Sequence, residues 1–264
     1  MVDTAGPGAS ANGALSGRHG RYRFEVRGND TDRRDRLAPH ALFSMMQEAA
    51  SLHAEHLGFG AAQFDPQGIA WVLLRVSVRM DAFPSWKDAL DIETWPSARD
   101  RLYGIRDFRF RDGEGRPLGG ATSAWLVVDT ATRRPKRMPP EAGLQDGESP
   151  ERALPAEAPK VEADPALDAA APVLRVACRE SDIDRNRHVN NARYVAWCVD
   201  ALQAAGLGDA PVAGLDMNYL SELLLGDEAE LRAVAVAPGE VLVDGRRSDG
   251  EPVFRARVLL ADAP

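Results

Sequence analysis

The fold is decided by residues 182–191, which read DIDRNRHVNN. A carboxylate, a carboxamide and an imidazole stand at alternate positions of this stretch, in Asp184, Asn186 and His188. Residues two apart lie on one face of an extended segment, so we expect the three side chains to project together. The next residues carry apolar side chains at i, i+3, i+4, i+7 and i+8, which predicts an amphipathic helix.

The start of that helix is a candidate binding site for a carbonyl group. Asn190 or Asn191 is suited to the N-cap, because the first N–H groups of a helix have no partners inside it. Free N–H donors and the positive end of the helix dipole stabilise negative charge on an oxygen. The stretch therefore indicates either a site that polarises a carbonyl or an ordinary capped helix after a polar loop.

The same pattern occurs a second time in the chain. Residues 22–32 align without a gap with residues 174–184, and both segments end in Asp-x-Asp. In the first copy, Arg34 and Arg36 replace the carboxamide and the imidazole, and Pro39 replaces the second asparagine of the cap. A requirement of the fold would act on both copies, so this difference favours chemistry in the second half.

The helices and strands of the two halves also correspond. Leu42, Met45, Met46 and Ala49 repeat the spacing of Tyr194, Trp197, Cys198 and Ala201. Strand patterns follow each helix, at residues 71–80, 90–95, 103–111 and 121–129 in the first half and about 215–225, 229–234 and 253–261 in the second. The order predicts an α+β fold in which each half wraps an antiparallel sheet around one long helix.

Length, charge and cysteine content describe a globular chain. The 264 residues carry a net charge of −8, which argues against general affinity for nucleic acid. No apolar run reaches the roughly 18 residues that a membrane-spanning helix needs. Cys178 and Cys198 stand among apolar neighbours, so two buried thiols in a reducing cytoplasm are the simplest interpretation, although the sequence leaves a disulfide open.

Two segments lack a periodic pattern. Residues 1–20 are rich in Gly, Ala and Ser without the apolar core of a secretory signal, so we expect a disordered tail. Residues 139–172 are rich in Pro, Ala, Glu and Asp, which is typical of a solvated linker. Structured units are then expected at residues 21–138 and 173–264.

Several short motifs keep a fixed order along the chain. They are WVLLR at 71–75, FPSWKD at 83–88, IETW at 92–95, RDF at 106–108, SAW at 123–125, TRR at 132–134 and the run from Asp184 to Trp197. In this order they resemble the acyl-acyl carrier protein thioesterases, whose fold is two fused hotdog domains. The resemblance implies an N-terminal hotdog domain at 21–138 that binds the acyl chain and a catalytic C-terminal hotdog domain at 173–264.

The resemblance also implies a catalytic set. It maps onto Asp184, Asn186, His188 and a later glutamate, which falls on Glu222. Leu223 stands where plant members of the family typically carry a cysteine, which argues against a thiol nucleophile there. Glu222 and His188 are both candidates for general base toward water, and direct attack by a carboxylate stays open. Backbone N–H groups near Asn190 and Asn191 are candidates for stabilising the oxyanion.

The implied reaction releases a fatty acid from an acyl carrier protein, which ends chain elongation in fatty acid biosynthesis and needs no cofactor. Candidate docking residues for the acidic carrier are Arg133, Arg134, Lys136 and Arg137, with Arg33, Arg34 and Arg36 as further candidates. Six apolar residues of this half are candidates either for lining the acyl-chain site or for the ordinary core: Met45, Met46, Leu52, Leu57, Phe64 and Trp71. The alternatives are an acyl-CoA thioesterase of the same fold and a non-catalytic acyl- or carrier-binding module. Because the two hotdog halves are fused, the chain already contains the interface that single-domain relatives form by dimerising. The protein is therefore expected to be a monomer or a homodimer.

Overall fold

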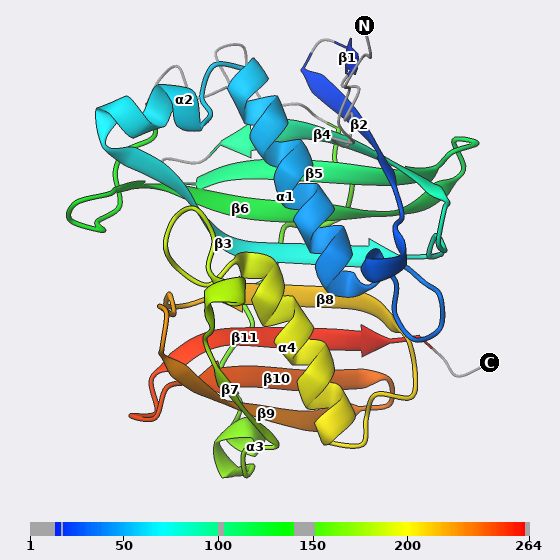
Figure 1. Ribbon diagram of the computed structural model, residues 1–264, viewed down its shortest axis with the longest axis vertical. Coiled ribbons are helices and arrows are strands. Elements are labelled where there is room, and N and C mark those ends of the chain that lie inside the picture. Colours follow the sequence, from blue (N-terminus) through cyan, green and yellow to red (C-terminus); the bar gives the residue numbers. More distant parts are fainter. Residues whose placement is uncertain (1–13, 17, 100–102, 140–150, 262–264) are drawn as a thin grey trace, which may run out of the picture.

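The computed structural model of the protein describes residues 14–16, 18–99, 103–139 and 151–261. Its strands form one antiparallel sheet of eleven strands, and the two long helices lie on one face of that sheet and contact each other (Figure 1). The predicted α+β class, with one long helix against the sheet in each half, is confirmed. No described helix is both long and apolar enough to cross a lipid bilayer.

The N-terminal half contains six strands and the first long helix. The elements are β1 (Ala14–Ser16), β2 (His19–Glu25), α1 (Pro39–His56), α2 (Ala61–Phe64), β3 (Ile69–Met80), β4 (Ala89–Arg99), β5 (Tyr103–Asp112) and β6 (Pro117–Asp129). Short 3-10 turns, Gly28–Asp30 and Asp65–Gln67, follow β2 and α2. Helix α1 begins with Pro39 at its first position and is followed by Gly58 in the left-handed region, at φ +81°, as expected for a helix end.

The C-terminal half repeats this order. Its elements are α3 (Pro165–Ala169), β7 (Leu174–Ala177), α4 (Asn191–Ala204), β8 (Val212–Tyr219), β9 (Glu228–Ala237), β10 (Glu240–Arg246) and β11 (Pro252–Leu260), with a 3-10 turn at Glu180–Asp182. Strand β8 ends at Tyr219, so residues 220–225, which the alternating pattern predicts as strand, form a loop. The other predicted strands of this half are present.

The sheet is symmetric about its centre. Its strand order is β1-β2-β4-β5-β6-β3-β8-β11-β10-β9-β7, so β3 and the equivalent strand β8 pair where the halves meet. Asp216 on β8 accepts hydrogen bonds from the hydroxyl of Ser77 (2.7 Å) and the guanidinium of Arg79 (3.0 Å) on β3. These buried contacts and the backbone pairing join both halves into one sheet.

The apolar faces of the two helices pack into a common core. The helical positions predicted to match across the repeat are all buried in one cluster, together with residues of β3, β5, β8 and β11. Both cysteines are free and buried, so the two-thiol interpretation is correct. The interhelical contact includes a hydrogen bond from the Gln47 amide to Asn190 Oδ1 (3.2 Å).

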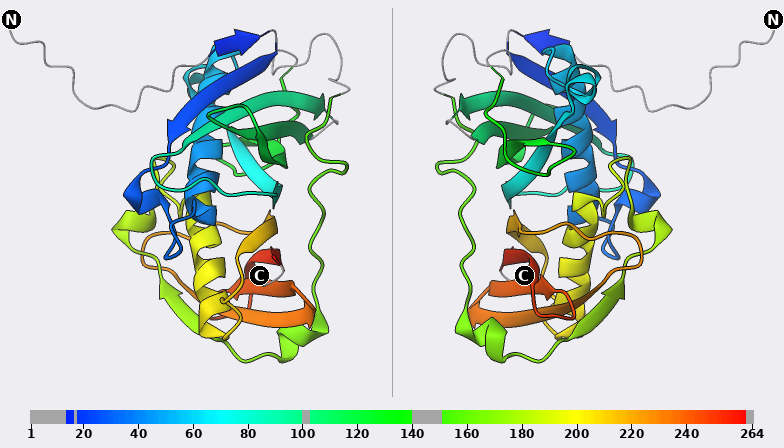
Figure 2. Two further views of the ribbon diagram at one scale, coloured as in Figure 1. Left: turned by 90° about the vertical axis from the view of Figure 1, so that its right-hand side faces the viewer. Right: turned by 90° about the vertical axis from the view of Figure 1, so that its left-hand side faces the viewer.

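The segment between the halves crosses the opposite face of the sheet from the helices (Figure 2). The prediction of a solvated linker is incomplete for its described part, because most of these residues are exposed but a few pack against the sheet. Val161 and Leu167 are buried against Leu242 of β10, and Arg152 pairs with the buried Asp107 (3.1 Å) on β5. The predicted tail at 1–20 is also too long, because β1 and the start of β2 lie within it; residues 1–13 are outside the described part.

Candidate active site

Residues 184–188 form a tight turn and not the extended segment that alternation suggested. The Asp184 N–H donates to the His188 carbonyl (3.0 Å), and Arg187 takes the left-handed conformation at φ +66°. The Asp184 side chain accepts the backbone N–H of Asn186 (2.8 Å), which fixes the turn locally. Asn186 lies in this turn and is exposed, whereas His188 is half-buried.

The His188 ring is held by its own turn. Nδ1 lies 3.3 Å from the Val189 carbonyl and 3.9 Å from Asp184 Oδ1, and both oxygens are acceptors. Their position favours the tautomer that carries its proton on Nδ1. Nε2 then keeps a lone pair, as a general base requires.

Glu222 comes from the loop after β8. Its carboxylate is exposed, with 42% of the side-chain surface accessible, and Oε2 lies 3.2 Å from Nη1 of Arg133. Its carbonyl accepts a hydrogen bond from Arg247. Leu223 is buried, its carbonyl accepts the Val189 N–H, and its own N–H donates to the Tyr194 hydroxyl, so it anchors the loop beside the His188 turn.

His188 and Glu222 line one pocket of about 380 Å³ at the meeting line of the halves. The C-terminal half also contributes Asn191, Tyr194 and Tyr219. The N-terminal half contributes Val72, Leu73, Leu74, Leu126, Val128, Arg133 and Pro135. Sequence reasoning missed these apolar walls, although the WVLLR motif contains three of them. Asp184 is not among the residues that line the pocket, but it lies close to His188, which is.

The start of α4 faces the same pocket. Asn190 is the N-cap, and its side chain accepts the backbone N–H of Ala192 (2.9 Å). Its carboxamide oxygen is therefore committed to the helix. Asn191 is the first helical residue and lines the pocket, and an N–H at this position has no partner within the helix. Of the two predicted oxyanion positions, the backbone of Asn191 is the better placed donor.

The equivalent turn of the N-terminal half has the same backbone and different chemistry. The Asp32 N–H donates to the Arg36 carbonyl (2.6 Å), and Asp35 is left-handed at φ +57°, as at residues 184–188. Leu37 N–H donates to the Pro84 carbonyl as Val189 N–H donates to Leu223, which places Phe83 at the position of Glu222. The predicted correspondence of Arg36 with His188 is confirmed.

The predicted docking residues form an exposed loop after β6. Lys136 pairs with Asp129 (2.9 Å), and Arg133 pairs with Glu222. Arg134 and Arg137 are exposed on the same loop. Pro135 of this loop lines the pocket, and Arg133 both lines it and pairs with Glu222, whereas the other three cations are not among the lining residues.

Both cysteines and His53 lie outside the pocket that His188 and Glu222 line. Burial raises the pKa of Cys198 well above its ordinary value and that of Cys178 to about 11, so neither thiol is an activated nucleophile. His53 is fully buried beside Arg106. Within the described ranges, no three His, Cys, Asp or Glu residues are grouped to hold a metal.

The sequence matches one known family over both halves. Residues 17–143 match the acyl-ACP thioesterase N-terminal domain, and residues 167–243 match the acyl-ACP thioesterase C-terminal domain. The chain belongs to the acyl-ACP thioesterase family. An acyl-ACP thioesterase from Bacteroides thetaiotaomicron is 27% identical and superposes with a TM-score of 0.84 over 92% of this chain and 98% of that one.

Plant members of the acyl-ACP thioesterase family are similar as well. The oleoyl-acyl carrier protein thioesterase 2 of Arabidopsis thaliana is 26% identical over 83% of this chain and 64% of its own length. The 12:0-ACP thioesterase from Umbellularia californica, 24% identical, shares the fold at a TM-score of 0.77 over 94% of this chain and 99% of that one. The chain spans less than two thirds of the length of the curated plant relatives it matches first.

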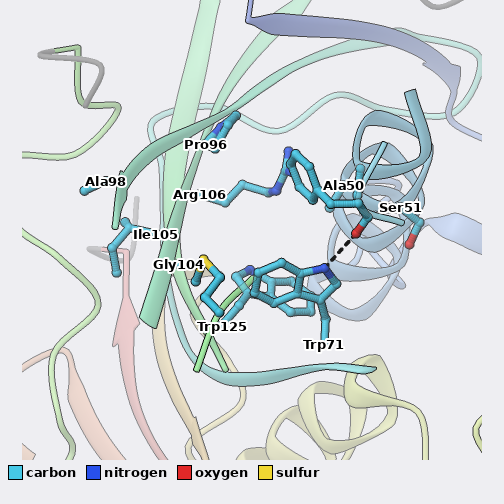
Figure 3. A pocket seen from close by; sticks show the side chains of 12 residues that line it. Ala50, Ser51, Trp71, Pro96, Ala98, Gly104, Ile105, Arg106 and Trp125 are labelled. Carbon is cyan, nitrogen blue, oxygen red and sulfur yellow. Dashed lines mark hydrogen bonds between the residues drawn. The ribbon is translucent and has the colours of Figure 1, made fainter. Parts of the chain in front are cut away.

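The hotdog architecture predicted from the motifs is therefore confirmed for this acyl-ACP thioesterase family member. Of the two alternatives left open for the six candidate lining residues, several take the core position. Met45 and Met46 pack in the main core, and Phe64 packs in a smaller cluster of the N-terminal half. Trp71 lines a pocket, which also has walls from α1, β4, β5 and β6 (Figure 3). The two methionines lie on the face of α1 that packs in the core. Helical spacing alone does not distinguish a core residue from one that lines a pocket.

Proposed function

We propose that this protein hydrolyses the thioester of a fatty acyl-acyl carrier protein and releases the free fatty acid, which ends chain elongation. The observation that carries the proposal is the pocket where His188 and Glu222 meet the start of α4. Membership of the family supports the reaction class, and the names of the similar plant and bacterial proteins support the carrier-bound substrate.

His188 is the proposed general base. With the proton on Nδ1 held toward Val189 and Asp184, Nε2 accepts a proton from water as the water oxygen bonds to the thioester carbonyl carbon. The carbonyl becomes an oxyanion, which the N–H of Asn191 stabilises. The C–S bond then breaks, and the leaving thiolate takes the proton from His188.

Glu222 is the proposed orienting group for that water. Its carboxylate pairs with the Arg133 guanidinium and accepts a hydrogen bond from water. This assigns water as the nucleophile and His188 as the base. Asn186 remains a predicted catalytic residue whose exposed side chain has to move on substrate binding to reach the pocket.

The loop at residues 129–137 is the proposed docking surface for the carrier. Its exposed cations flank the pocket, and an acyl carrier protein is strongly acidic, so charge attraction brings the acyl-pantetheine arm toward His188. The carrier engages one protein chain, because the fused halves already form the pocket between them. The protein is proposed to act in the cytoplasm, where the free thiols of Cys178 and Cys198 remain reduced.

An acyl-CoA thioesterase is the second candidate, because the same pocket chemistry serves any acyl thioester. Release of free thiol by the purified protein, measured on one acyl chain bound to carrier protein and to CoA, separates the two. The proposal predicts a higher kcat/KM on the carrier-bound substrate. Higher kcat/KM on CoA favours the second candidate, and no release from either indicates a binding module.

A further inference from the structure

Two tyrosines contact the segments that carry the candidate catalytic groups. Tyr194 lies on α4 and Tyr219 ends β8, and both line the pocket of His188 and Glu222. Their rings meet edge to face, with 5.7 Å between the centroids. Each hydroxyl group makes a hydrogen bond to the backbone of a different segment at the pocket.

The hydroxyl of Tyr194 holds the loop of Glu222. It accepts the backbone N–H of Leu223 (3.1 Å), the residue directly after Glu222. The tyrosine ring is itself fixed, because it packs edge to face against Trp197 and Phe254. Leu223 is fully buried, so its N–H would lack an acceptor if the hydroxyl were removed.

The hydroxyl of Tyr219 holds the start of α4. It donates to the carbonyl of Asn191 (3.1 Å), the first residue of that helix. A carbonyl oxygen has two lone pairs, so this bond adds to the one within the helix. Because it restrains the first peptide groups of α4, it also fixes the direction of the Asn191 N–H, the proposed donor to the oxyanion.

The N-terminal half lacks both hydroxyl groups. Leu42 of α1 stands at the position of Tyr194 in the repeat, and Met80 ends β3 as Tyr219 ends β8. Leu42 and Met80 are both buried in the common core. The hotdog scaffold therefore accepts apolar side chains at these two positions and does not require a hydroxyl at either.

The backbone donor of the first bond is missing from the N-terminal half as well. The equivalent backbone bonds of the two loops align Pro84 with Leu223. Because proline has no N–H, this half lacks both the donor and the acceptor of the bond between Leu223 and Tyr194. The bond is present in the copy that has His188 and Glu222 and absent from the copy in which both are replaced.

The loop after the strand closes in the same way in both halves. The Leu224 N–H donates to Asp227 Oδ2 (2.9 Å), and the Ser85 N–H donates to Asp88 Oδ2 (2.8 Å). The N-terminal loop has this closure without a tyrosine hydroxyl. The bond to Tyr194 is therefore an addition to a loop that folds without it.

We propose that Tyr194 and Tyr219 are positioning residues for the hydrolysis. Tyr194 holds the carboxylate of Glu222 at the pocket, and Tyr219 holds the N–H of Asn191 toward the oxyanion. This role rests on the proposed function and adds two residues to its site. Each tyrosine acts through another group, so loss of its hydroxyl should slow the reaction and leave substrate binding nearly unchanged.

The first test removes one hydroxyl at a time and keeps the rings. Tyr194→Phe and Tyr219→Phe should each lower kcat on an acyl-carrier substrate about tenfold, as expected for one hydrogen bond, without a comparable change in KM. Tyr22→Phe is the matched control, because Tyr22 is a buried tyrosine of the same core in the N-terminal half. Native kcat in either folded variant overturns the role of that tyrosine.

A second test identifies the group through which each tyrosine acts. In a Glu222→Ala background, Tyr194→Phe should cause no further loss of kcat, because the carboxylate that it positions is gone. Tyr219→Phe should keep its full effect there, since it acts through Asn191. A full tenfold loss from Tyr194→Phe in that background contradicts its coupling to Glu222.

A third measurement keeps these roles apart from the proposed function. Amide hydrogen exchange is followed in the protein without substrate, where the N–H of Leu223 reports its bond to Tyr194. Exchange at Leu223 should be faster in Tyr194→Phe than in the native protein and unchanged in Tyr22→Phe. Faster exchange supports the anchor even when no thioester is hydrolysed, and unchanged exchange in Tyr194→Phe contradicts it.

Discussion

In the N-terminal half, the guanidinium of Arg36 lies over the ring of Phe83, 5.7 Å from its centroid. These two residues occupy the positions that His188 and Glu222 hold in the C-terminal half. A cation over an aromatic face is a stabilising contact without a proton acceptor, so this copy holds the turn together but offers no base. The pair of a histidine and a glutamate at this turn is therefore present in the C-terminal copy and replaced in the N-terminal copy.

The first prediction concerns that copy. Arg36→Ala removes the contact with Phe83 and the ion pair with Asp32 (3.0 Å), so the protein should lose about 1 kcal/mol of stability. The value of kcat on an acyl-carrier substrate should be largely retained, because no reacting group is touched. Steady-state kinetics beside thermal unfolding checks both. A loss of kcat as large as that of a His188 variant would place chemistry in the N-terminal half.

The second prediction concerns the two buried aspartates that support the turns. Asp182 accepts the Arg179 N–H (2.9 Å) and the Arg193 side chain (2.7 Å), and Asp30 accepts the N–H and the guanidinium of Arg27. Replacing either by Ala leaves a backbone donor unsatisfied, which costs about 1–3 kcal/mol. Asp182→Ala should also reduce kcat, because the turn that carries His188 loses its anchor.

Asp30→Ala is the matched control for that experiment. It should cost similar stability, measured by urea unfolding, and spare kcat under conditions where both variants are folded. Equal effects of the two substitutions on kcat would show that the aspartates act through global stability alone.

The third prediction separates docking from chemistry. Arg134→Glu with Arg137→Glu should raise KM for the carrier-bound substrate and spare a small acyl-pantetheine thioester, because these exposed cations lie off the pocket. The effect should shrink as salt is added. Arg133 is unsuited to this test, because its ion pair with Glu222 links it to the reaction centre. Equal losses on both substrates would exclude this loop as the docking surface.

The fourth prediction concerns stability at low pH. His53 has a pKa of about 3 when folded, lowered first by burial and then by Arg106, against about 6.5 in the unfolded chain. The unfolded chain binds the extra proton as pH falls below about 6.5, so stability is lost from there toward pH 3, by at most about 1.4 kcal/mol per pH unit.

His53→Gln should flatten that part of the stability profile, measured by urea unfolding between pH 7 and pH 4. His56→Gln on the same helix is the control, because His56 is exposed and should leave the slope as it is. Identical slopes in the native protein and His53→Gln would show that this histidine is not the group that titrates.

The sequence predicted the architecture well for a physical reason. Two copies of one pattern gave the same strand–helix–strand order twice, and Leu42 and Tyr194 each mark a buried helical face. Periodicity encodes which face is buried, so the α+β class followed from it. The packing of Val161 and Leu167 onto the sheet was missed, because isolated apolar residues in a Pro-rich segment have no period.

The site was predicted in part. His188 and Glu222 lie at one pocket as the family resemblance implied, whereas Asn186 is exposed and is not among the residues that line it. Alternation was taken as an extended segment, but Arg187 in the left-handed region and the Asp184 side chain close a turn instead. Local hydrogen bonds of this kind override period-two patterns. The hydrogen bond between Leu223 and Tyr194 joins the loop after β8 to α4, a contact that no local pattern contains.

The central claim is that the pocket of His188 and Glu222 hydrolyses an acyl-carrier thioester. Its most direct test is the rate of thiol release from one acyl-carrier substrate by the native protein, His188→Gln and Glu222→Gln, each verified as folded by circular dichroism and thermal unfolding. The account predicts that His188→Gln lowers kcat at least about a hundredfold, as expected for loss of a general base, and that Glu222→Gln lowers it less. Near-native kcat in both folded variants would contradict the account.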